Sequence, residues 1–171
     1  MRLPTSGACV TDTTGAADAA KLQRQLSALR QAHERLLAAM ADLDGLTKNG
    51  VVDESYIHIR FRLSAASLAR RRLWQHIFRG LKPLVSGSDT DTLADLNTAD
   101  LQLLRRSAEH VCTWSSQTVE RRWREYAQAS KLLRRDMAEA IGDEKRLLYP
   151  LLAKYAALGA AGMEASARNP A

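Results

Sequence analysis

Apolar residues separated by alternating steps of three and four run through most of this chain, and this spacing constrains the fold more than any other feature. An α-helix completes a turn every 3.6 residues, so residues spaced in this way share one face of a helix. In residues 18–44 the stripe consists of Leu22, Leu26, Leu29, Leu36, Met40 and Leu43. Its single interruption is His33. Gly45 and the turn-forming residues 47–50 are predicted to end this first helix.

Three further segments have helical periodicity, over residues 53–80, 98–122 and 123–158. The predicted inward residues of the second segment are Ile57, Phe61, Ala65, Leu68, Leu73 and Ile77. Those of the third segment are Leu101, Leu104, Ala108, Val111, Ser115 and Val119. The fourth segment has the clearest stripe, with Tyr126, Ser130, Leu133, Met137, Ala140, Glu144, Leu147 and Leu151.

The remaining segments are predicted to be connections or tails. Residues 82–98 contain Pro83, Gly87 and a Ser/Asp/Thr run, which predicts a long connection with a short turn near residues 93–96. Pro150 lies inside the fourth stripe and should kink the helix or loosen one turn. Residues 1–17 and 159–171 are predicted to be disordered tails. The core segment 18–158 therefore predicts an all-α protein, an antiparallel up-down-up-down four-helix bundle.

Size and cysteine usage suggest a cytoplasmic protein. A chain of 171 residues with 46% hydrophobic content can bury a core without disulfides or metal. Cys9 and Cys112 lie far apart and form no recognisable framework, which favours a reducing compartment. No apolar run suits a signal peptide or a membrane span, so we expect a cytoplasmic protein without a membrane partner.

Arginine gives the chain a formal net charge of +6. The clusters are Arg70, Arg71 and Arg72; Arg105 and Arg106; Arg121 and Arg122; and Arg134 and Arg135. Glu and Asp are interleaved with them, which is typical of solvated helix faces. The alternative is binding of nucleic acid or another acidic surface through Arg70, Arg71, Arg72, Arg105, Arg106, Arg121 and Arg122.

Two polar residues, His33 and Glu144, stand on otherwise apolar stripes. A buried imidazole or carboxylate costs free energy unless it is paired. If the first and last helices are antiparallel, a rise of 1.5 Å per residue places these two side chains within about one turn of each other. His110 reaches nearly the same level on the third helix. The three residues predict either a hydrogen-bonded polar layer that fixes register or a site for iron, manganese or zinc.

Two short segments resemble the hemerythrin-like family, also called the HHE cation-binding bundle. Residues 141–150, IGDEKRLLYP, are similar to the acidic segment and Leu-Tyr-Pro turn of its last helix. Residues 31–37, QAHERLL, are similar to the histidine segment of its first helix. In helix order and length the resemblance covers residues 20–156.

This resemblance implies a metal centre held by all four helices, but the ligand set is incomplete. His33 and Glu144 match expected ligands and His110 is a candidate for the third helix, whereas Ala140 stands where a histidine is expected. In the second helix the ligand pair falls on Arg70 and Trp74, or in another register on His76 and Gly80. We favour the first register, in which Arg70 could form an ion pair with Glu144 and replace the charge of the metal.

The sequence therefore favours a non-catalytic regulatory or interaction protein with a degenerate metal centre and a protein partner, and no cofactor is expected. The alternatives are an iron- or zinc-binding protein of the same fold that senses oxygen or nitric oxide through His33, His110 and Glu144, and a nucleic-acid-binding protein. An enzyme is not predicted, because Ser115, Cys112 and the histidines lack the spacing that places a nucleophile beside a base.

Overall fold

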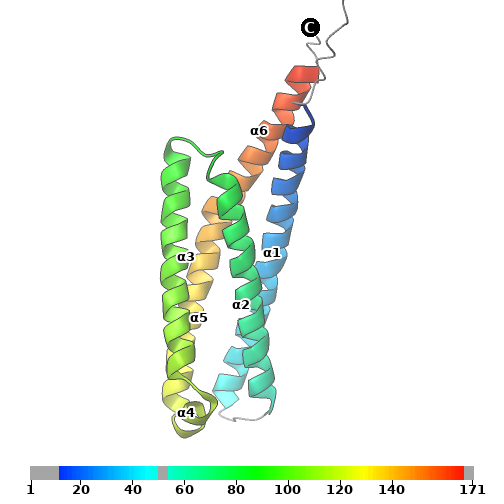
Figure 1. Cartoon of the computed structure of the whole chain (residues 1–171). Coiled ribbons are helices and arrows are strands. Elements are labelled where there is room, and N and C mark those ends of the chain that lie inside the picture. The colour runs from blue at the N-terminus through cyan, green and yellow to red at the C-terminus, as the bar shows by residue number, and fades with distance from the viewer. Residues whose placement is uncertain (1–11, 50–53, 168–171) are drawn as a thin grey trace, which may run out of the picture.

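The structure, a computed structural model, describes residues 12–49 and 54–167, and within these ranges the chain is helical with short connections and no strand (Figure 1). This confirms the predicted all-α class. The elements are α1 (Asp12–Asn49), α2 (Glu54–Leu81), α3 (Ser88–Thr113), α4 (Ser116–Arg121), α5 (Trp123–Asp143), the π-helical turn η1 (Glu144–Leu148) and α6 (Tyr149–Ala167).

The long helices lie alongside one another, and α5, η1 and α6 continue into a single rod (Figure 1). Helix α1 packs against α2 and α6, whereas α3 packs against α5. The beginning of α1 and the end of α6 lie together beyond the ends of α2 and α3 (Figure 1). This arrangement brings α1, α2, α3 and the junction of α5 with α6 together at mid-length.

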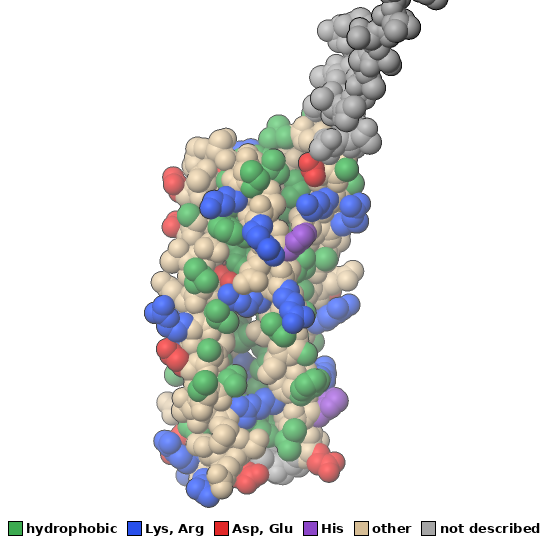
Figure 2. All heavy atoms as spheres, in the orientation of Figure 1, with side chains coloured by type: hydrophobic (Ala, Val, Ile, Leu, Met, Phe, Trp, Pro, Cys, Tyr) green, Lys and Arg blue, Asp and Glu red, His purple; other side chains and the backbone are tan. Residues whose placement is uncertain are grey.

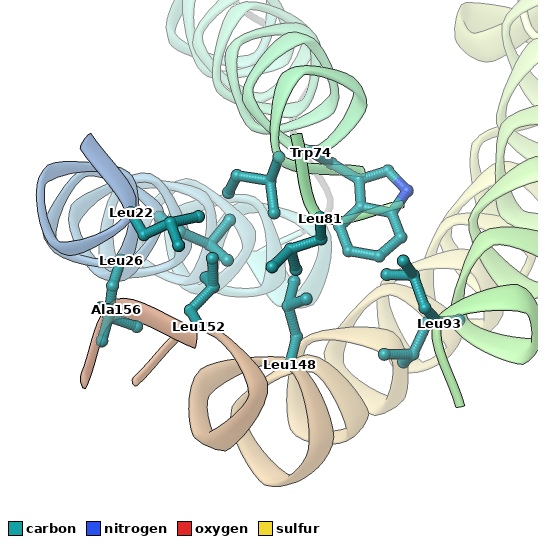
Figure 3. Packing of buried hydrophobic residues seen from close by; sticks show 11 residues of the cluster. Leu22, Leu26, Trp74, Leu81, Leu93, Leu148, Leu152 and Ala156 are labelled. Carbon is teal, nitrogen blue, oxygen red and sulfur yellow. The ribbon is translucent and has the colours of Figure 1, made fainter. Parts of the chain in front are cut away.

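Three hydrophobic clusters follow one another along the molecule. In the largest, Leu22 and Leu26 of α1 face Leu152 and Ala156 of α6 (Figure 3). The indole of Trp74 fills the space between α2 and α3 beside Leu81, Leu93 and Leu148 (Figure 3). The stripes of α1 and of α5 with α6 therefore bury the faces that their spacing predicted.

The predicted inward face of α2 is wrong for Ile57, Phe61, Ala65 and Leu68, whereas Ile77 is buried as predicted and Leu73 packs against the largest cluster. Ile57, Phe61 and Leu68 are 59%, 72% and 48% exposed, and the buried residues are Tyr56, Arg70, Trp74, Ile77 and Leu81. The true inward face carries an arginine near its middle. A search for apolar residues alone therefore selected the neighbouring face.

The third helix begins earlier than predicted and also presents a different face. Helix α3 starts at Ser88, directly after Gly87 with its φ of 58°, and the acidic residues of its first turn suit a helix N-terminus. The buried residues are Leu93, Leu96, Asp100 and Leu103, whereas the predicted Leu101, Leu104 and Val111 are exposed. The Ser/Asp/Thr run is thus a helix start and not a connection.

The ends of the helices also differ from prediction. Helix α1 begins at Asp12 and continues through Gly45 to Asn49, and α6 continues to Ala167. The rest of the predicted tails, residues 1–11 and 168–171, lie outside the described residues. Ser115, which was predicted to point inward, instead caps α4. Its hydroxyl oxygen accepts a hydrogen bond from the backbone N–H of Thr118 at 3.2 Å.

Candidate functional site

Four buried polar side chains meet at mid-length, one from each long helical segment. They are His33 of α1, Arg70 of α2, Asp100 of α3 and Glu144 of η1, and none is more than 5% exposed. Polar groups at this depth must satisfy one another, because water does not reach them. Their contacts therefore define the chemistry of this layer.

His33 bridges two residues of the last helical rod. Its Nε2 lies 2.6 Å from Oε2 of Glu144, and its Nδ1 lies 2.7 Å from the hydroxyl of Tyr149. A neutral imidazole satisfies both contacts when Nε2–H donates to the carboxylate and Nδ1 accepts the tyrosine O–H. The predicted meeting of His33 and Glu144 is confirmed.

The π-helical turn explains why Glu144 and Tyr149 reach the same histidine. In a regular α-helix, residues five apart point about 140° away from each other. In η1 the backbone N–H of Tyr149 donates to the carbonyl of Glu144, an i to i+5 bond that brings the two residues to one face. Pro150 follows directly and removes a donor from the α-helical ladder, so the loosened turn predicted there is confirmed.

Arg70 joins the two carboxylates of the layer. Its guanidinium donates to Oε1 of Glu144 and to Oδ1 of Asp100, the latter at 3.2 Å. Arg71 donates to the other oxygen of Asp100 at 3.2 Å. The charges balance, because two guanidinium groups face two carboxylates. The ion pair of Arg70 with Glu144 that the sequence suggested is confirmed.

Burial and neighbouring cations keep the imidazole neutral. Burial, followed by the charges of Arg70 and Lys145, lowers the pKa of His33 from 6.5 to about 3. Burial also lowers the pKa of Arg70, while Asp100 raises it. The layer thus holds two guanidinium groups, two carboxylates and a neutral histidine near pH 7.

The depressed pKa of His33 predicts that acid destabilises the fold. Between pH 6.5 and about 3 the unfolded chain protonates His33 and the folded chain does not, so the free energy of unfolding decreases as the pH falls. One such group contributes up to about 1.4 kcal/mol per pH unit. Urea unfolding from pH 7 to pH 4 measures this slope. His33→Gln, which cannot titrate, should have a shallower slope, and an equal slope would contradict the prediction.

The residues of this layer do not form a ligand set for a metal ion. Both oxygens of Glu144 are engaged, one by His33 and one by the guanidinium of Arg70, which places a cation where a metal would bind. Within the described ranges, no group of three or more His, Cys, Asp or Glu side chains could hold a metal.

The third candidate ligand, His110, lies elsewhere. Its ring is 5.7 Å from that of Tyr126 and 6.4 Å from that of Trp114, measured between centroids, beside the cluster near α4. The structure therefore does not bring His110 to His33 and Glu144. His58 and His76 are exposed on α2.

Sequence reasoning missed Asp100 and Tyr149. Asp100 continues the spacing of Leu93, Leu96 and Leu103. A helical stripe that allowed one carboxylate among its apolar residues would therefore have included it. Tyr149 had no such signal, because its contact with His33 depends on the π-helical turn.

The arginine clusters are mostly surface features. Arg70 is 4% exposed, so its assignment to a nucleic-acid surface is wrong. Several exposed arginines pair with acidic neighbours, among them Arg106 with Asp136 at 3.3 Å and Arg146 with Asp143 at 2.7 Å. The pairing is typical of a solvated helix face.

No protein-family model, curated protein or solved structure matches this chain. None of the helices in the described residues combines the length and apolar character that crossing a membrane requires.

Proposed function

We propose that this chain is an antiparallel four-helix bundle of the hemerythrin-like type in which an arginine replaces the metal, and that it acts as a non-catalytic regulatory or interaction protein. The observation that carries the proposal is the contact of Arg70 with Glu144, the carboxylate that also faces His33. A guanidinium supplies the positive charge that two facing carboxylates need, and it does so without open coordination positions.

The surface supports a binding role. Ile57 and Phe61 stand one turn apart on α2 and are 59% and 72% exposed. Large apolar side chains grouped on a surface are typical of protein contacts. Because His33, Arg70, Asp100 and Glu144 are buried and engaged with one another, they serve as a rigid scaffold for such a contact.

Metal analysis tests the replacement of the metal by Arg70. We expect the purified full-length protein to contain far less than one metal per chain, and ferrous iron added in air to produce no oxo-iron absorption. Because ligands that bind only the folded state stabilise it, excess ferrous or zinc ions should also leave the melting temperature unchanged. One iron or zinc per chain, with raised stability, would favour the metal-sensing alternative instead.

A further inference from the structure

A groove of about 400 Å³ opens between α2, α3 and α5, and neither His33, Arg70 nor Glu144 lines it. Small side chains on the facing walls leave this space. They are Ser64 and Ser67 of α2 and Ser107 and Ala108 of α3. The face shown in Figure 2 is hollowed between these two helices. Its volume falls within the range of pockets that bind small molecules, roughly 300–1,000 Å³.

Apolar side chains form most of the groove. Leu63, Leu68, Leu104, Val111 and Met137 line it. Of these, Leu68, Leu104 and Val111 remain 48%, 41% and 58% exposed. An apolar body laid between α2 and α3 would remove this surface from water.

The polar residues of the groove favour an anion. Arg60, Arg71 and Arg134 line it, and no Asp or Glu of the described residues does. Arg71 and Arg134 already pair with carboxylates at 3.2 Å. The guanidinium of Arg60 instead donates to the Tyr56 hydroxyl at 3.1 Å and to the carbonyl of Trp114, and the described chain gives it no carboxylate partner.

His110 adds a neutral donor at the same end of the groove. Burial, followed by the charges of Arg60 and Arg134, lowers the pKa of His110 to about 4. The imidazole is therefore uncharged at pH 7 and retains one N–H. The positive potential that opposes protonation of His110 attracts an anion.

We propose that this groove binds an amphipathic monocarboxylate, with its carboxylate at Arg60 and His110 and its hydrocarbon body against the apolar side chains of α2 and α3. The lining favours such a molecule, because no Asp or Glu of the described residues lines the groove and Arg60 has no carboxylate partner among them. This binding site goes beyond the proposed function, and its test does not depend on metal content.

Calorimetric titration of the full-length protein with octanoate, and with octanol as the uncharged analogue, tests the site. We expect octanoate to bind at least about tenfold more tightly, because a charge-assisted hydrogen bond to a guanidinium is lost with octanol. Arg60→Gln should abolish this preference. Arg62→Gln is the matched control, because Arg62 is on the same helix as Arg60, pairs with Asp42 of α1 at 3.0 Å and does not line the groove.

Two further variants locate the bound ligand. Ala108→Trp should fill the groove and abolish octanoate binding while the circular dichroism spectrum stays unchanged. In a Cys9→Ser background, octanoate should slow the reaction of exposed Cys112, which lines the groove, with a maleimide. Equal binding of octanoate and octanol, a preference that survives Arg60→Gln, or binding of only an acidic amphipathic peptide would each overturn the proposal.

Discussion

Replacing Arg70 by methionine is expected to lower the free energy of unfolding by roughly 3–5 kcal/mol, the usual result of removing one partner from a buried ion pair. Arg70 is 4% exposed and contacts both Glu144 and Asp100. Methionine keeps most of the aliphatic volume of the side chain. The loss of stability therefore arises because the carboxylate of Glu144 retains only the neutral His33 as a partner. Urea unfolding at pH 7 measures it.

The matched control is a surface ion pair between Arg62, on the same helix as Arg70, and Asp42 of α1. Arg62 lies 3.0 Å from Asp42, and both side chains are nearly half exposed. Arg62→Met should therefore change the free energy of unfolding by less than about 1 kcal/mol. Adding Glu144→Gln to Arg70→Met should recover part of the loss, because it removes the unpaired charge. Similar effects of Arg70→Met and Arg62→Met would show that the buried layer contributes little.

Trp74→Ala should lower the free energy of unfolding by about 3–5 kcal/mol through the cavity that it leaves. Trp74 is fully buried and packs in the largest hydrophobic cluster, with the ring of Phe78 at 6.3 Å. Trp74→Phe should lower the free energy of unfolding by less, because it keeps an aromatic ring and removes an indole N–H that has no hydrogen-bond partner.

His76→Ala serves as the control for Trp74, because His76 is exposed two residues further along α2. We expect it to change the free energy of unfolding by no more than about 0.5 kcal/mol. Thermal or urea unfolding compares the three variants. A small effect of Trp74→Ala would contradict the packing described for α2 and α3.

The buried layer was partly predictable. His33 and Glu144 each interrupt a clear stripe, and the constant rise of a helix places them at one level, so their meeting could be predicted without coordinates. Arg70 was predicted from the resemblance to the hemerythrin-like family, because it stands at a ligand position of the second helix. Asp100 was not recognised as its partner, because the stripe of α3 had been assigned to the wrong face.

The sequence by itself determined that the chain is helical, and it determined the inward faces of α1 and α5. Apolar residues recur at steps of three and four on both faces, around Gln25 and His33 in α1 and around Ser130 and Arg134 in α5, so local periodicity is sufficient to identify them. Only the tertiary structure decided the inward faces of α2 and α3, where Arg70 and Asp100 are buried. A charge can be buried only when a remote partner compensates it, and a segment contains no signal of a partner 30 or 74 positions away.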